Sequence, residues 1–262
     1  MMHPPAPSRL RTFMVRLAIA LLVLGVGFIA HGMWARGWRP DARDWPMQGV
    51  AIGADNAPIS WPSLASQGAS FAYIDALDGS HIVHRVSQTD SAPYDFATQQ
   101  GAASAAGLRV GAIHHFAICT LASDQAAAFV RVVPRDRDAL PPAIILDLDP
   151  DCPRHPTQAL LLSELSTFLN QIETHMGKMV VIAPSPEFED AYHITAAINR
   201  PLWLRSPRSE PDSTGPAWTI WQANDDLRIT GSTGQTRWLV LHDATSQARA
   251  AAEAAQAAKD DE

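Results

Sequence analysis

The sequence predicts an α/β fold: an irregular barrel of the (β/α)8 type, preceded by an N-terminal transmembrane helix. Three observations lead to this prediction. Eight short β-rich runs alternate with helical stretches, short connections join them, and one long apolar run comes before them all. The 262 residues, 47% of them hydrophobic, are enough to bury one large core, and α/β barrels commonly use this length as a single domain.

The apolar run predicts a membrane-spanning helix over residues 13–35. Residues 17–30 (LAIALLVLGVGFIA) carry no charge, and with the residues that follow they reach about the length that a helix needs to cross a bilayer. Arginines at positions 9, 11 and 16 precede the run, which predicts a cytoplasmic segment over residues 1–12 and export of the rest. We therefore expect a single-pass protein of the bacterial inner membrane whose main domain faces the periplasm.

A cleaved signal peptide is the alternative interpretation, because the purely apolar part of this segment is short. No clear small-x-small cleavage site follows, and Trp34 and Trp38 suit an anchor at the membrane interface. Arg36, Arg39 and Arg43 on the far side weaken the predicted orientation without reversing it. These features favour an uncleaved signal anchor.

Three further segments follow the anchor. Residues 36–48 contain two prolines and no periodicity, which is typical of a linker. The barrel domain is expected over residues 49–244. Residues 245–262 are rich in alanine and predict a helical tail.

The barrel is expected to form from alternating strands and helices. The strand candidates are Gly49–Gly53, Ser70–Asp75, Arg109–His115, Ala143–Asp149, Met179–Ala183, Pro201–Arg205, Trp218–Gln222 and Trp238–His242. The helical candidates are Pro62–Gln67, Pro93–Ala106, Ser123–Val133, Pro156–His175 and Pro186–Ile198. Little helix separates the later strands, so the last third of the barrel should be more purely β.

The charge distribution argues against nucleic acid as a partner of the barrel. The net charge of the chain is −7. Residues 1–43 contain six Arg and one Asp, which leaves −12 on the remainder. Phosphate binding needs concentrated positive charge, and the main domain has the opposite balance.

Two aspartates end the fourth strand candidate. Ala143–Asp149 is short and apolar, which predicts a strand buried on both faces, and side-chain alternation then points Asp147 and Asp149 the same way, with Cα atoms roughly 6.5–7 Å apart. Two carboxylates there cost solvation free energy unless they are hydrogen-bonded or used. Active sites of such barrels lie at the C-terminal ends of strands, so both are candidate catalytic residues. The alternative is that they merely cap the strand and begin a loop.

Five segments of the domain carry patterns of one known family. SFAYIDALDG (70–79) is similar to FAYIKATEG, AAGLRVGAIHHF (105–116) to AAGLKVGAYHFF, LPPAIILDLD (140–149) to LPPVLDVE, and PLWL (201–204) with WTIWQ (218–222) to PLWIA and WTIWQ. No single segment is specific, but five in register over most of the domain are. The domain therefore resembles glycoside hydrolase family 25, the muramidase-type lysozymes that cut peptidoglycan.

The resemblance implies a set of site residues. Asp149 would be the general acid, and Asp147 would orient or stabilise the reacting group, with the acetamido group of the substrate as a possible nucleophile. Asp78, His114, Trp203 and Gln222 would contact the sugar. The resemblance implies no cofactor and no metal, and peptidoglycan or a related glycan as the partner.

Several positions depart from the family pattern. Ala51 stands where the first strand normally ends in an acid, and Asp149 replaces a Glu, which retracts the carboxylate by one methylene. The aspartate of a late VDLN motif aligns with Arg237 or Trp238, depending on one residue of register. Asp75 stands where the family often has Lys, and it could join an acidic mouth or be a solvated loop acid.

Adjacent histidines end the third strand candidate. Because successive side chains of a strand point to opposite faces, His114 and His115 cannot both face the site. By the resemblance His114 faces the cleft and His115 packs. Paired His near Asp can also indicate a metal site, but neighbouring residues of a strand cannot easily ligate one ion together.

The chain has two cysteines, Cys119 and Cys152, each a few residues beyond a predicted strand end. Those two strands should be neighbours in the barrel, and an exported domain lies in an oxidising compartment. A disulfide joining the two loops at the rim of the site is therefore plausible.

Two functions fit these observations. The first is an N-acetylmuramidase-like enzyme that cleaves β-1,4 glycosidic bonds of peptidoglycan, and the second is a catalytically impaired module that binds cell-wall glycan. An open cleft lined by both carboxylates would favour the enzyme. Arg205 or Arg237 neutralising them would favour the binder.

Overall fold

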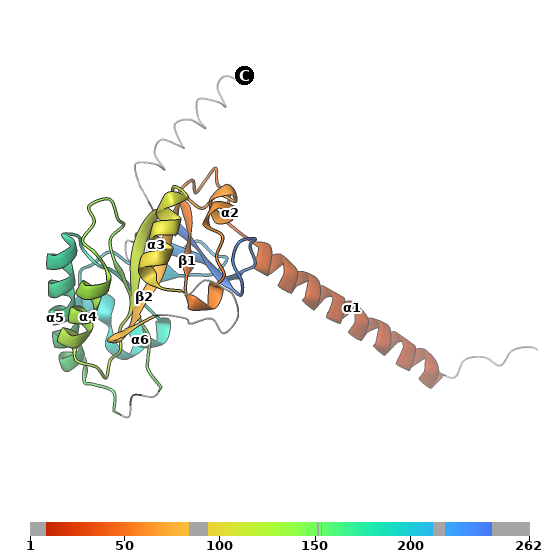
Figure 1. The fold of residues 1–262 in the computed structure, drawn as a ribbon. Helices are drawn as coiled ribbons and strands as arrows, with labels where there is room; N and C mark the ends of the chain where they lie inside the picture. The colour runs from red at the N-terminus through yellow and green to blue at the C-terminus, as the bar shows by residue number, and fades with distance from the viewer. Residues whose placement is uncertain (1–8, 84–93, 151, 153, 212–217, 243–262) are drawn as a thin grey trace, which may run out of the picture. The chain divides into compact units, whose positions relative to one another are not determined.

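The computed structural model describes residues 9–83, 94–150, 152, 154–211 and 218–242, and the expected helical tail lies outside this part of the chain. The chain divides into two compact units, Met1–Trp38 and Arg39–Glu262. The first consists of helix α1 (Arg9–Gly37), drawn in red in Figure 1. Its 25-residue portion Phe13–Gly37 has a mean hydropathy of 2.5 and is long and apolar enough to cross a membrane, as expected for residues 13–35.

The second unit is a mixed α/β barrel. Its strands are β1 (Gln48–Ile52), β2 (Phe71–Asp78), β3 (His81–Ile82), β4 (Arg109–His115), β5 (Ala143–Leu146), β6 (Val181–Pro184), β7 (Trp203–Arg205), β8 (Ile220–Leu227) and β9 (Thr236–Leu241). Its helices are the 3-10 helix η1 (Ala54–Asn56), α2 (Trp61–Ser66), α3 (Phe96–Ala105), α4 (Ala122–Val132), α5 (Gln158–Met176), α6 (Pro186–Tyr192) and α7 (Ile194–Ala197). A strand forms at each of the eight expected places, and the short hairpin strand β3 adds to them.

The sheet curls into a nearly closed barrel. The strand order is β6-β5-β4-β2-β1-β9-β8-β7, with β3 paired to β2. The strands from β6 to β1 run parallel, whereas β9 is antiparallel to both β1 and β8. An isolated parallel bridge between Ile182 and Leu202 brings β6 to β7. The fold is therefore the expected irregular (β/α)8-type barrel, with antiparallel pairing in its last third.

Large side chains fill the barrel interior at alternate positions of each strand. Phe71 and Tyr73 of β2 and Trp203 of β7 belong to this core. The Tyr73 ring lies against Gly111 of β4, where a Cβ would overlap the ring. Glycine at this position is therefore what lets a tyrosine occupy the narrow interior.

Helices cover the outside of the parallel strands, with α4 and α5 side by side (Figure 1). The expected helix over Pro186–Ile198 is divided into α6 and α7, because His193 adopts a left-handed conformation with φ 48° and ends α6. Asp95 and Thr157 accept backbone hydrogen bonds at the N-termini of α3 and α5. These caps begin the helices close to where the sequence places them.

The fourth strand is shorter than expected. It ends at Leu146, so Asp147 and Asp149 lie in the loop that follows and not within a strand. Leu146 pairs with Pro184 at the end of β6, and its carbonyl oxygen accepts the backbone N–H of Ser185 at 2.9 Å. The two aspartates remain at the C-terminal end of the barrel, but strand alternation no longer fixes their directions.

Candidate active site

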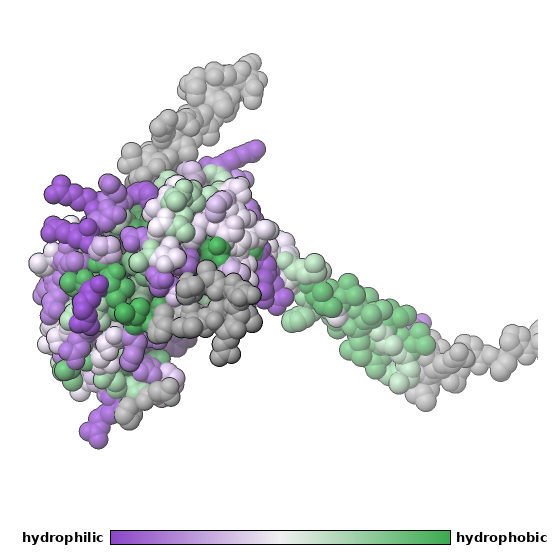
Figure 2. Space-filling model, in the orientation of Figure 1, coloured by the Kyte–Doolittle hydropathy of each residue, from purple (hydrophilic) through white to green (hydrophobic). Residues whose placement is uncertain are grey.

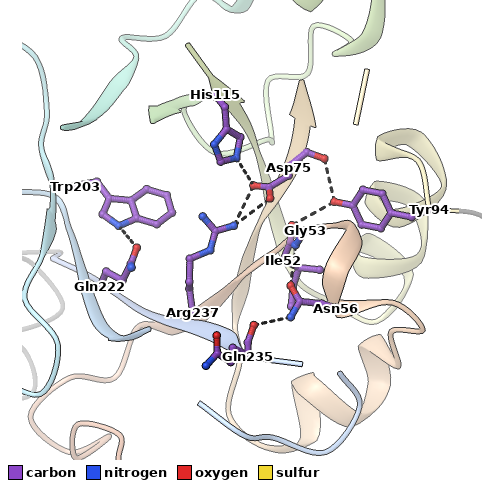
Figure 3. A network of polar contacts seen from close by, with 10 residues as sticks. All are labelled: Ile52, Gly53, Asn56, Asp75, Tyr94, His115, Trp203, Gln222, Gln235 and Arg237. Carbon is purple, nitrogen blue, oxygen red and sulfur yellow. Dashed lines mark hydrogen bonds and ion pairs between the residues drawn. The ribbon is translucent and has the colours of Figure 1, made fainter. Parts of the chain in front are cut away.

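An ion pair occupies the C-terminal mouth of the barrel. Asp75 follows Tyr73 at the next inward position of β2, and its side chain is 14% exposed. Arg237 Nη2, from β9, donates to Asp75 Oδ1 at 3.0 Å and to Oδ2 at 3.2 Å. His115 Nε2, from the end of β4, lies 3.2 Å from Asp75 Oδ1. Figure 3 shows the carboxylate between these two basic side chains.

The surroundings of Asp75 keep it ionised. Burial alone would raise the pKa of Asp75, but the charge of Arg237 and the hydrogen bond and charge of His115 outweigh burial and hold the pKa below its usual range. Tyr94 supports the same region, because its hydroxyl donates to the carbonyl oxygens of Asp75 at 2.9 Å and Ile52 at 3.2 Å. Burial raises the pKa of Tyr94, so this hydroxyl stays protonated and remains a donor.

A second ion pair lies across the mouth. Arg205 Nη1, from β7, is 3.0 Å from Asp147 Oδ1. The Asp147 side chain is 51% exposed, whereas that of Arg205 is 24% exposed. Arg205 Nη2 also donates to the carbonyl oxygen of Ala183 on β6 at 3.3 Å. Asp147 is therefore accessible, but a fixed cation partly neutralises it.

Three aspartates, which do not include Asp75, line a hollow of about 150 Å³ at this end of the barrel. Its lining, which we call the acidic hollow, consists of Asp78, His115, Phe116, Ala117, Ile145, Asp147, Leu148 and Asp149. Asp78, at the end of β2, and the pair Asp147 and Asp149, beyond β5, thus contribute to one surface. The arrangement can supply carboxylates as proton donor and as electrostatic stabiliser to a bound polar ligand.

Comparison with known proteins agrees with this geometry. The family model for glycosyl hydrolases family 25 matches residues 52–232, which is more than half of the chain. The chain belongs to glycosyl hydrolase family 25. No curated protein sequence matches it.

Solved structures of family 25 share the fold. A family 25 glycosyl hydrolase from Bacillus anthracis is 28% identical, with 81% of this chain and 95% of that chain covered and a TM-score of 0.67. A lysozyme from Streptomyces coelicolor is 22% identical (77% and 94% covered, TM-score 0.63), and a family 25 lysozyme from Aspergillus fumigatus is 20% identical (78% and 98% covered, TM-score 0.61). The barrel is therefore the family 25 lysozyme fold.

Two departures from the family 25 pattern meet in the first ion pair. The family often has Lys at the position of Asp75, and its late aspartate aligned with Arg237 or Trp238. Arg237 is the one that faces the site, since Trp238 is buried and its Nε1 donates to Gln48 Oε1 at 2.6 Å. The two positions carry charges opposite in sign to the family pattern and still form a pair. Asp75 is therefore not the solvated loop acid considered from the sequence.

The expectation that His114 contacts substrate is corrected by its burial. His114 is 0% exposed on the helix-facing side of β4, with Nε2 3.0 Å from Gln125 Oε1 and its ring centroid 4.6 Å from that of Phe168. Burial lowers its pKa to about 4, so the ring is neutral near pH 7. The two histidines do point to opposite faces, but His115 is the one in the site. Strand alternation predicts that the two side chains point to opposite faces of β4, but it does not tell which face lies inside the barrel.

Trp203 and Gln222 also lie inside the barrel and not on an exposed surface. Trp203 is 0% exposed, and its Nε1 donates to Gln222 Oε1 at 3.0 Å. Gln222 Nε2 donates to Asp225 Oδ1 at 2.5 Å. Figure 3 shows this pair beside Arg237. Both residues thus support the floor of the mouth, and neither presents a sugar-stacking face.

A disulfide joins two loops near the site. Cys119 and Cys152 are disulfide-bonded, with Cα atoms 5.8 Å apart, and the bond joins the loops that follow β4 and β5. Within the described residues, no group of three or more His, Cys, Asp or Glu is arranged to hold a metal ion. Sequence reasoning named Arg205 as a residue that could neutralise the aspartates, and it is paired with Asp147. It missed Tyr94, whose hydroxyl donates to the carbonyl oxygens of Asp75 and Ile52.

Proposed function

We propose that this domain is a peptidoglycan hydrolase of the N-acetylmuramidase type, which cleaves the β-1,4 bond after N-acetylmuramic acid. The observation that carries the proposal is the acidic hollow, where Asp147 and Asp149 lie together at the C-terminal end of a family 25 barrel. The names of the similar structures, which include lysozymes, support a glycan as the substrate.

The chemistry assigns one role to each aspartate. Glycoside hydrolysis needs an acid that protonates the leaving oxygen and a second group that assists at the anomeric carbon. Asp149 is the proton donor in this proposal, and Asp147 orients or stabilises the acetamido group of the substrate. Because Asp149 is one methylene shorter than the family Glu, and a misplacement of about 1 Å can cost roughly a hundredfold in rate, we expect slow turnover.

A specific observation favours a second function, a glycan-binding module with impaired catalysis. Arg205 pairs with Asp147, which reduces the negative charge available to stabilise a developing cation. Ala51, where the family has an acid, is fully buried and brings no carboxylate. The hollow is open and lined by both aspartates, which favours the enzyme. The pairing of Asp147 with Arg205 favours the binding module.

The experiment compares the full-length protein in detergent with Asp149→Asn and Asp147→Asn variants. Release of new reducing ends from purified peptidoglycan measures cleavage, and co-sedimentation with peptidoglycan measures binding. Asp138→Asn, which changes an exposed acid that precedes β5, is the matched control. Cleavage by the wild type and the control that is lost in both site variants supports the hydrolase. Sedimentation without cleavage in all four proteins supports the binding module.

We also propose that α1 anchors the protein in the inner membrane with the barrel in the periplasm. The length and apolar composition of Phe13–Gly37 support the anchor, and arginines at positions 11 and 16 support the orientation. Protease added to spheroplasts tests it. Digestion of the barrel in intact spheroplasts agrees with a periplasmic domain, whereas protection until lysis contradicts it.

A further inference from the structure

A second and larger concavity lies beside the acidic hollow. It has a volume of about 430 Å³, which is within the range of ligand sites. One wall comes from residues 118–121, which follow β4, and the other from residues 154–164, which include the first turns of α5. We call this concavity the apolar groove.

The groove contains two leucine side chains that are largely exposed to solvent. Leu121 on one wall is 62% exposed and Leu160 on the other is 54% exposed, and the buried side chains of Ile118 and Leu161 lie beneath them in the lining. Figure 2 shows hydrophobic surface over the region of α4. Exposed apolar surface gathered in a concavity is typical of a binding site.

The lining of the groove adjoins that of the acidic hollow. Ala117 lines the hollow, and the next residue, Ile118, lines the groove. On the other side, the His155 ring nitrogen Nε2 donates to the carbonyl oxygen of Asp149 at 3.1 Å, so a groove residue contacts a hollow residue. The Cys119–Cys152 disulfide fixes the two loops to one another. A ligand in the hollow that carried a side branch could therefore extend into the groove.

The charges of the two concavities differ. The hollow carries the carboxylates of Asp78, Asp147 and Asp149, which would repel an anionic group. The groove instead includes Arg154 and His155 on one wall. Its one acidic lining residue, Glu164, accepts the backbone N–H of Ala122 through Oε2 at 2.8 Å and thereby caps α4. The groove therefore suits a ligand that is both apolar and anionic.

We propose that the apolar groove binds the peptide that muramic acid carries on its lactyl group. This inference rests on the proposed function, because it assumes that the sugar occupies the acidic hollow. The peptide presents small apolar side chains to Leu121 and Leu160, and its carboxylates to Arg154. The groove thus distinguishes peptide-bearing glycan from glycan without peptide.

The test measures binding by the full-length protein in detergent with isothermal titration calorimetry. The probes are a disaccharide ending in N-acetylmuramic acid, the same disaccharide with a tetrapeptide on the lactyl group, and the free tetrapeptide. Neither disaccharide contains the bond after muramic acid, so the proposed activity does not consume them. We expect the peptide to tighten disaccharide binding at least about tenfold, as expected from covering one exposed leucine side chain.

Two groove variants and a matched control locate the effect. Leu160→Ser and Arg154→Gln should each remove most of the tenfold difference and leave binding of the bare disaccharide unchanged. Val130→Ser, which changes an apolar side chain of α4 that is 40% exposed and outside the groove, should change neither affinity. Unchanged binding of the bare disaccharide also shows that the variants are folded.

The outcomes separate the inference from the proposed function. Equal affinities for the two disaccharides overturn the inference and leave glycan binding intact. Binding of the free tetrapeptide without the bare disaccharide keeps the groove assignment and counts against the glycan function, and binding of no probe counts against both. A self-association that Leu160→Ser abolishes, with equal probe affinities, assigns the groove to a second copy of the chain and overturns the inference.

Discussion

Replacing Asp75 with asparagine should destabilise the barrel substantially. The change leaves the Arg237 guanidinium, 24% exposed, without its carboxylate partner. Removing one member of a buried ion pair costs about 3–5 kcal/mol, and the residual exposure of both side chains puts the expected value near 3 kcal/mol. For a domain of this size, 3 kcal/mol lowers Tm by roughly 6–12 °C.

Thermal unfolding of the full-length protein in detergent, followed by near-ultraviolet circular dichroism, measures the effect. The double variant Asp75→Lys with Arg237→Asp restores opposite charges at the two positions and should recover at least half of the loss. Asp226→Asn is the control, because it breaks the more exposed Arg208–Asp226 pair and should cost less than about 1 kcal/mol. A Tm for Asp75→Asn within 2 °C of the wild type would refute the reasoning, and so would a double variant no more stable than the single one.

The same pair gives a pH dependence with a definite sign. The pKa of Asp75 is lower in the folded protein than its ordinary value near 4, so the unfolded chain takes up this proton first as the pH falls. The stabilisation is therefore complete at neutral pH and is lost progressively below about pH 4. The difference in Tm between the wild type and Asp75→Asn should accordingly shrink in acid, whereas a difference that is constant down to pH 3 contradicts the assignment.

Three further predictions concern the fold around the site. His114, with a pKa lowered from 6.5 to about 4, should make the unfolding free energy fall by about 3 kcal/mol between pH 6.5 and pH 4, and His114→Phe should flatten this dependence in denaturant titrations. Reducing the Cys119–Cys152 bond, which spans 33 residues, should lower the free energy of unfolding by about 3–4 kcal/mol. The control is the protein with both cysteines replaced by serine, whose Tm should be the same with and without reductant. Gly111→Ala should lower the unfolding free energy by about 1–3 kcal/mol through overlap with Tyr73, and an unchanged Tm would contradict that packing.

The strands could be predicted because each is a short apolar run bounded by turn residues. The ends of the strands could not be predicted as well, because they depend on hydrogen bonds to neighbouring strands. β5 ends with the pairing of Leu146 and Pro184, where its partner β6 also ends, although the sequence pattern of Ala143–Asp149 continues. The division between α6 and α7 likewise depends on a left-handed backbone at His193, a conformation that few non-glycine residues signal in advance.

The site could be predicted in part. The grouping of Asp78, Asp147 and Asp149 follows from the rule that strand ends of a parallel barrel share one mouth. The choice between His114 and His115 could not be made from the sequence, because strands of a parallel sheet are apolar on both faces and alternation does not tell inside from outside. The partner of Asp75 lies 162 residues away in sequence, beyond any local pattern.

The isolated bridge between Ile182 and Leu202 has a consequence for the mouth of the barrel. Among the described strands it joins β6 to β7 with less backbone pairing than a regular ladder provides, so local opening should cost least free energy along this seam. Arg205 of β7 links the two sides of this seam, since its guanidinium contacts both Ala183 on β6 and Asp147 beyond β5. Replacing Arg205 with glutamine should therefore speed amide hydrogen exchange along β7 while the distant strands stay protected.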